Sequence, residues 1–168
     1  MSEAPSHTPQ APVHTPNGAA VTDLFRMIFQ VNARLIADGD ELGRDLGFTS
    51  ARWQVLGAAG DAVRSVAQLA RHMGLARQSV QRLVDWLEER GFVVLVDNPD
   101  HQRAKLVQLT EKGIETRSKL KSRQIAWVNE LGLALSGDDL ETALNVLIGL
   151  RQGLDKARPA RRGAKTDL

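Results

Sequence analysis

The 168-residue sequence contains no cysteine and no tyrosine, and only 4% of its residues are aromatic. The absence of cysteine excludes disulfides, thiolate metal sites and thiol-based redox sensing. The scarcity of aromatic residues argues against a β-sandwich, because such sheets rely on aromatic and β-branched side chains. No apolar run approaches the ~18 residues of a membrane-spanning helix, and residues 1–18 lack the apolar core of a secretory signal. We therefore expect a cytoplasmic protein that does not associate with membranes.

Motifs that carry enzymatic chemistry are also missing. The sequence has no G-x-S-x-G, P-loop, H-E-x-x-H or glycine-rich dinucleotide loop. Asp85, Glu88 and Glu89 form an acidic helix face rather than an acid–base pair, and His72 and His101 are isolated, which disfavours a metal site. These observations predict that the protein is not an enzyme and has no cofactor.

Charge is distributed unevenly along the chain. The net charge is +2, but residues 156–168 alone carry +4, so the rest of the chain is slightly acidic. Any affinity for DNA must then come from local basic clusters rather than from bulk charge. We expect residues 158–168 to be a flexible basic tail and the proline-rich residues 1–20 to be a disordered arm.

Residues 65–91 have the pattern of a helix-turn-helix. Ser65 begins a short apolar-striped segment that ends at Gly74, and a second stripe, Val80, Leu83, Val84 and Leu87, ends at Gly91. The i, i+3, i+4, i+7 spacing is typical of amphipathic helices, and glycine commonly ends a helix in the left-handed conformation. Two short helices joined by a tight turn predict a helix-turn-helix.

The periodicity changes after Gly91. Residues 92–96 are apolar and largely β-branched, residues 97–100 are a turn signal, and residues 104–109 form a return strand. The result is a predicted hairpin with its tip at residues 101–103. A hairpin that directly follows the second helix of a helix-turn-helix is a wing.

Three further helix starts pair a capping side chain with flanking apolar residues, namely Thr49, Thr110 and Ser136. Another helix is expected from about Thr22, with residues 37–47 fraying or turning. The apolar stripes on residues 21–35 and 140–154 exceed what the small winged unit can cover. Their burial between two chains predicts a homodimer, although packing within one chain is the alternative.

The second helix presents a polar face suited to DNA. Arg77, Gln78, Ser79, Gln81 and Arg82 lie away from the apolar stripe, and the basic residues precede the acidic ones. Glutamine can pair with adenine and arginine with guanine in the major groove, while Arg77 or Ser79 can instead hold phosphates. The alternative is a merely solvated face, but the adjoining hairpin with Arg103 at its tip favours DNA, because a basic residue on a narrow loop can enter the minor groove.

With these elements in place, the chain resembles the MarR (multiple antibiotic resistance regulator) family. The resemblance lies in the segments GFT (47–49), VAQLA (66–70), QSVQRLV (78–84), LEERGF (87–92), NPDHQRAK (98–105) and LTEKG (109–113). It implies a dimeric winged helix-turn-helix protein whose first and last helices interleave with those of its partner. Residues 76–90 would then be the recognition helix, and Arg103 the wing arginine that enters the minor groove.

The same resemblance implies that His101 and Gln102 join the DNA contacts, and that a small aromatic or phenolic ligand releases the protein from DNA. By family position the ligand candidates are Phe29, Asn32, Arg52 and Trp53, although core packing is the alternative for Trp53. Two positions depart from the family pattern. Ala76 stands where a capping Ser or Thr is common, and His101 stands where many members have an Asp that braces the wing arginine.

The sequence therefore predicts a mainly α fold with a small β-hairpin wing. The expected parts are an arm (1–20), an N-terminal dimerisation helix with its connection (21–47), a winged helix-turn-helix (48–109), C-terminal dimerisation helices (110–157) and a tail (158–168). The expected function is sequence-specific binding of double-stranded DNA at a palindromic operator, as a ligand-released repressor. A winged protein-interaction module and an enzyme with an unrecognised site are the alternatives.

Overall fold

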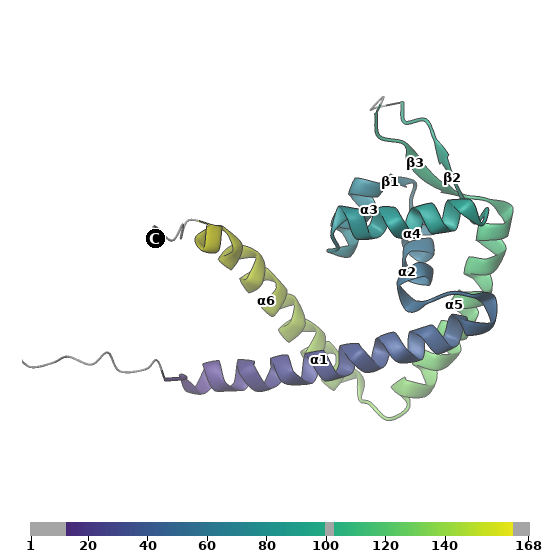
Figure 1. Cartoon of the computed structure of the whole chain (residues 1–168). Helices are drawn as coiled ribbons and strands as arrows, with labels where there is room; N and C mark the ends of the chain where they lie inside the picture. Colours follow the sequence, from purple (N-terminus) through teal and green to yellow (C-terminus); the bar gives the residue numbers. More distant parts are fainter. Residues whose placement is uncertain (1–12, 100–102, 163–168) are drawn as a thin grey trace, which may run out of the picture. The chain divides into compact units, whose positions relative to one another are not determined.

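The computed structural model describes residues 13–99 and 103–162, and the chain divides into two compact units, residues 1–120 and 121–168 (Figure 1). The first unit contains α1 (Pro16–Gly43), the 3₁₀ helix η1 (Arg44–Leu46), α2 (Ser50–Asp61), β1 (Arg64–Ser65), α3 (Val66–Met73), α4 (Arg77–Glu89), β2 (Val93–Val96), β3 (Leu106–Leu109) and the start of α5 (Glu111–Gly132). The second unit contains the rest of α5 and α6 (Gly137–Arg162).

The predicted fold class is confirmed, with one strand more than expected. β2 and β3 form the antiparallel hairpin, in which Val93 pairs with Leu109 and Val96 with Leu106. β1 was not predicted, and its two residues pair with Val107 and Leu106 on the other side of β3. The sheet order is therefore β1-β3-β2. A strand this short has no periodicity by which it can be recognised.

The predicted helix starts are confirmed by their capping hydrogen bonds. Thr49 accepts from the backbone N–H of Arg52 at 3.4 Å, and Thr110 and Ser136 accept from the third residue beyond them at 3.1 Å. Ser65 and Gln68 form a complete capping box. Gly74 and Gly91 adopt the expected left-handed conformation, with φ of 67° and 72°. These bonds satisfy backbone donors that a helix start otherwise leaves without partners.

The first helix differs from the prediction at both ends. It begins at Pro16 instead of near Thr22, because Thr15 caps Gly18 and proline is well suited to the first helical position. It also continues to Gly43, so only the end of the segment expected to fray or turn does so, where η1 and the left-handed Gly47 form a turn. Gly43, the last residue of α1, is buried against Phe48, where a Cβ would overlap the Phe48 carbonyl group and side chain. The glycine thus permits the close approach of the helix end to Phe48.

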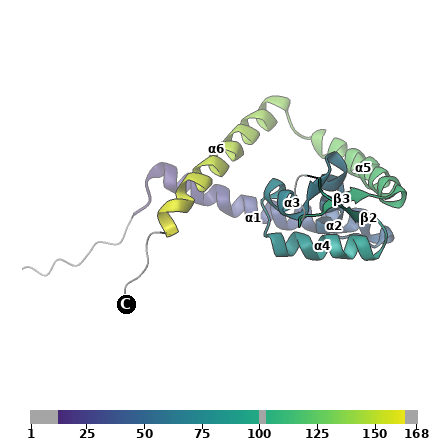
Figure 2. The same ribbon diagram turned by 90° about the horizontal axis from the view of Figure 1, so that it is seen from above.

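The core lies inside the first unit. Val80, Val84 and Leu87 of α4 are fully buried together with Leu69 of α3 and Val107 of β3. α4 packs against α2, α3 and β2, and Figure 2 shows it running along one side of this group of elements. The apolar stripe that predicted the helix is therefore the surface that holds it, which leaves the opposite face of α4 toward solvent.

An aromatic cluster fixes the C-terminal half of α4. The ring of Phe48 lies edge-on to Trp86 and Phe92, with centroid distances of 5.4 and 4.9 Å. Arg52 stacks over Trp86 with Cζ 3.9 Å from the ring centroid, and Arg90 lies 4.4 Å from it. Trp86 is thus a packing residue at the edge of the core. The cluster connects α4 to the residues that start the hairpin and so keeps helix and wing together.

Candidate nucleic-acid interface

The predicted reading face of α4 is presented to solvent. Arg77, Gln78 and Arg82 are exposed, and Ser79 and Gln81 are half-buried. Val80 and Val84, which alternate with them along the helix, have no exposed surface. The polar and apolar residues are therefore sorted onto two faces, as an element that enters a groove requires.

The start of α4 has no side-chain cap. Ala76 occupies the N-cap position and makes no capping hydrogen bond, and Leu75 before it is 46% exposed. The first turn therefore relies on its packing and on the turn at Gly74. The absence of a side-chain cap, inferred from the sequence as a departure from the family pattern, is confirmed.

The two cations of α4 lie in its first half, and the carboxylates lie in its second. Arg77 and Arg82 precede Asp85, Glu88 and Glu89, and all five side chains are exposed. A phosphate backbone attracts the first half and repels the second. The charge order therefore gives the helix a preferred end toward DNA.

The wing is described in part. Arg103 and Lys105 are exposed on the segment that leads into β3. His101 and Gln102, both predicted to contact DNA, lie outside the described residues, as does Asp100. The geometry of the wing tip is therefore given only from Arg103 onward.

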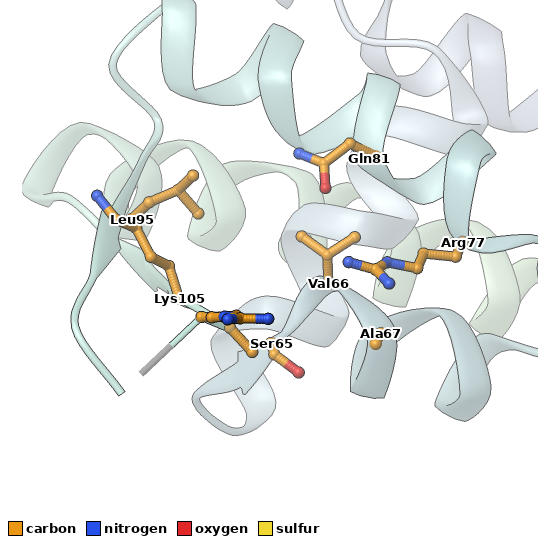
Figure 3. A pocket seen from close by; sticks show the side chains of 9 residues that line it. Ser65, Val66, Ala67, Arg77, Gln81, Leu95 and Lys105 are labelled. Atoms are coloured by element: carbon orange, nitrogen blue, oxygen red, sulfur yellow. The ribbon is translucent and has the colours of Figure 1, made fainter. Parts of the chain in front are cut away.

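An open pocket of about 200 Å³ lies between α4 and the wing. Figure 3 shows Arg77 and Gln81 of α4 on one side of the pocket and Lys105 of the wing on the other, with Val66 at the start of α3 between them. Arg103 also lines the pocket. Among its described lining residues three are cationic and none is a carboxylate, so the concavity is suited to an anion.

Sequence reasoning missed part of this site. Lys105 and the residues at the start of α3, Ser65 to Ala67, were not assigned to the interface, yet they line the pocket. Lys105 had a usable signal, since it is a second cation two residues after Arg103 at the predicted hairpin tip. The α3 residues had none, because only the tertiary fold brings β1 beside β3.

The four ligand candidates occupy different environments. Phe29 and Asn32 are exposed on α1. The indole N–H of Trp53 donates to the carbonyl of Gly39 at 3.0 Å. The guanidinium of Arg52 stacks on Trp86 and donates to the carbonyl of Gly47 at 3.2 Å. The polar groups of Arg52 and Trp53 therefore have structural partners.

Two further absences hold for the part of the chain that the structure describes. No group of three or more His, Cys, Asp or Glu side chains is arranged to hold a metal ion. No described helix combines the length and apolar character needed to cross a bilayer.

Comparison with known proteins identifies the family. The MarR family model matches residues 46–104. The protein Rv2011c of Mycobacterium tuberculosis is 33% identical over 139 residues, which is 83% of this chain and 97% of the relative. The transcriptional activatory protein BadR of Rhodopseudomonas palustris is 28% identical over 86% of this chain and 87% of its own length.

Solved structures agree on the fold. The MarR family regulator AbsC from Streptomyces coelicolor has a TM-score of 0.74 at 18% identity, covering 87% of this chain and 99% of its own. A mutant of Escherichia coli MarR complexed with operator DNA has a TM-score of 0.70 at 24% identity, covering 78% and 95%. CouR from Rhodococcus jostii, bound to p-coumaroyl-CoA, has a TM-score of 0.69 at 25% identity, covering 76% and 91%.

Fold, site and comparisons together define a winged-helix transcription regulator, a class of DNA-binding proteins and not of enzymes. The chain belongs to the MarR family.

Proposed function

We propose that this protein binds double-stranded DNA sequence-specifically, with α4 in the major groove and Arg103 of the wing in the adjacent minor groove. The observation that carries the proposal is the cationic pocket, which α4 and the wing line together. A duplex that meets both elements brings its phosphates past Arg77 and Lys105. Contacts of that kind set the register of the protein on DNA.

Base recognition is assigned to the exposed side of α4. Gln78, Gln81 and Arg82 have side chains that can form two hydrogen bonds with a single base, each pairing contributing about 1–3 kcal/mol of discrimination. Arg77 and Ser79 are instead assigned to the phosphates of the DNA backbone. His101 and Gln102 complete the wing contacts in this proposal.

A homodimer on a palindromic operator follows from the terminal helices. α1 exposes Met27, Val31 and Leu35, and α6 exposes Leu140, Leu144, Leu147 and Leu154, each at least 44% accessible. Apolar surface of this extent on isolated helices is characteristic of an interface. A two-fold dimer presents two copies of α4 to two half-sites.

We propose repression, released by a small aromatic or phenolic ligand, as the regulatory mode. The structure of CouR with bound p-coumaroyl-CoA, a phenolic thioester, supports the ligand class. BadR is a transcriptional activatory protein, so the position of the operator relative to its promoter decides between repression and activation.

Footprinting tests the DNA contacts. Fragments selected from the source genome are bound by the wild type and by the Arg82→Ala, Gln81→Ala and Arg103→Ala variants. Arg103→Ala should weaken binding to all sequences, whereas the two α4 variants should alter sequence preference. Lys121→Ala removes a cation of α5 outside the pocket and serves as the control. Unchanged footprints and affinities in all three variants would remove the assignment.

Phe29→Ala tests the ligand assignment separately. Phe29 is 73% exposed in the chain, so its truncation leaves the core intact. Release of the operator fragment is titrated with p-coumaroyl-CoA and p-coumarate. The variant should bind the fragment as the wild type does and require more ligand for release. An identical response in both proteins would contradict the assignment of Phe29.

A further inference from the structure

A hydrogen bond within α4 concerns its proposed base-reading residue. Gln81 donates through Nε2 to Oδ1 of Asp85 at 2.7 Å. The two residues are one helical turn apart and share a face. Gln81 is half-buried and lines the cationic pocket, while Asp85 is exposed.

The carboxylate determines which way the Gln81 amide points. An ionised carboxylate only accepts hydrogen bonds, so it holds the NH₂ end of the amide and not its carbonyl. The carbonyl oxygen must then point away from Asp85, and in Figure 3 it lies on the Val66 side of the Gln81 side chain. Without such a partner the two ends of a glutamine amide can exchange places by a flip.

We propose that Asp85 is a positioning residue for base recognition, which makes Gln81 present its carbonyl oxygen as an acceptor to the major groove. The assignment rests on the proposed function and deepens it. Gln81 then selects a base whose exocyclic amino group lies in the major groove, adenine or cytosine, over guanine or thymine.

The base chemistry follows from the groove edges. Adenine offers the N6 amino donor beside the N7 acceptor, and cytosine offers the N4 amino donor. Guanine offers two acceptors, N7 and O6, which would meet the Gln81 oxygen unfavourably. An amide that donates one N–H to Asp85 keeps its second N–H for adenine N7. Adenine is therefore the preferred base at this position.

Exclusion of water by DNA reinforces the arrangement. The hydrogen bond is exposed in the unbound chain, where a pair of this kind is weak. A hydrogen bond becomes electrostatically stronger in a medium of low dielectric constant. Asp85 therefore orients Gln81 most strongly when DNA is bound and the base edge excludes water from the hydrogen bond.

The test compares base preference in matched variants on a library in which each operator position is varied. In the wild type, adenine at the position read by Gln81 should be favoured over guanine about 5- to 150-fold. Gln81→Ala identifies that position by flattening its preference. Asp85→Asn, whose amide can either donate or accept, should lower the preference at the same position, because it no longer selects the NH₂ end of the Gln81 amide. Asp85→Glu, which retains a carboxylate, should preserve it.

Charge removal is controlled by Glu88→Gln, an exposed residue one turn along α4. Both Asp85→Asn and Glu88→Gln should raise affinity for all sequences, since each removes one negative charge near DNA. Of these two variants, only Asp85→Asn should change base preference. In the double variant Gln81→Ala, Asp85→Asn, the base preference at the position read by Gln81 should be the same as in Gln81→Ala alone.

Two outcomes contradict the inference alone, and a third contradicts the proposed function on which it rests. If Asp85→Asn raises affinity as Glu88→Gln does and leaves base preference intact, Asp85 does not position Gln81. The proposed DNA-binding function would still stand. A preference for guanine or thymine at the operator position read by Gln81 contradicts the proposal that Gln81 presents its carbonyl oxygen as an acceptor. Failure of the wild type to distinguish any sequence overturns the proposed function itself, and with it this inference.

Discussion

The winged unit and the terminal helix α6 bury their apolar residues differently. Every buried hydrophobic side chain of the described residues lies between Phe48 and Leu120. α6, by contrast, exposes Leu140, Leu144 and Leu147 by 44 to 58%. The elements proposed to read DNA therefore have a core of their own, whereas α6 has an apolar stripe without one. The first region is stabilised within the chain, and the second is suited to a partner.

The largest expected effect is on the core of the winged unit. Leu87 is fully buried, and truncation of such a leucine creates a cavity that the surroundings fill only in part. Leu87→Ala should lower the free energy of unfolding by about 2–5 kcal/mol. Urea denaturation followed by circular dichroism measures the change. A loss below about 1 kcal/mol would show that the core is not packed around α4.

The next effect concerns α6. Leu144→Asp places a charge in the apolar stripe, and a carboxylate left unpaired in an interface is strongly unfavourable. We expect the variant to be a monomer whose affinity for the operator is at least about 100-fold lower. Light scattering after gel filtration gives the mass, and a binding titration gives the affinity.

Thr142→Asp is the control for that change, since it adds the same charge on the opposite side of α6, where residue 142 is also exposed. This variant should remain dimeric. A dimeric Leu144→Asp protein with full operator affinity would sink the assignment of α6 to the interface.

A pair of glycine substitutions sharpens the description of the first unit. A Cβ at Gly113 would overlap the carbonyl oxygen of Phe92, whereas one at Gly57 meets nothing within 4 Å. Gly113→Ala should therefore destabilise the protein by about 1–3 kcal/mol, as overpacking does. Gly57→Ala in α2 should stabilise it by about 0.5–1 kcal/mol. Thermal unfolding of both variants checks the signs, and equal effects would refute the close approach of α5 to Phe92.

The smallest expected effect is at the start of α4. Ala76→Ser supplies the missing N-cap and should stabilise the first turn by about 1 kcal/mol. Hydrogen exchange of the backbone amides of residues 77–79 measures this locally. Slower exchange there with unchanged exchange in α2 is the expected result, and no slowing would mean that the turn at Gly74 already holds the helix end.

Local patterns allowed much of the winged unit to be predicted from the sequence. The stripe of Val80, Leu83, Val84 and Leu87 placed α4, and the glycines and capping residues placed its neighbours. Features that depend on tertiary contacts were missed or misplaced. β1 is too short to have a period, the Arg52–Trp86 stack joins residues distant in sequence, and Gly43 resembles a helix breaker until its contact with Phe48 is seen.

The candidate site likewise combines features that local sequence patterns predict with features that only the tertiary fold shows. The exposed positions of α4 followed from helical spacing alone, because a regular helix repeats its faces. The pocket required the fold, since it joins α4, the wing and the start of α3. The carbonyl orientation of Gln81 required atomic positions, because the sequence does not say which i+4 neighbour its amide bonds.

The most direct test of the central claim, that α4 and the wing read DNA together, is a salt titration of binding to two duplexes. One is a fragment selected from the source genome, and the other has the same composition in scrambled order. Both affinities should fall steeply between about 50 and 200 mM salt, with the selected fragment bound at least about 10³-fold more tightly. Equal affinity for the two duplexes, or binding that does not depend on salt, would contradict the account.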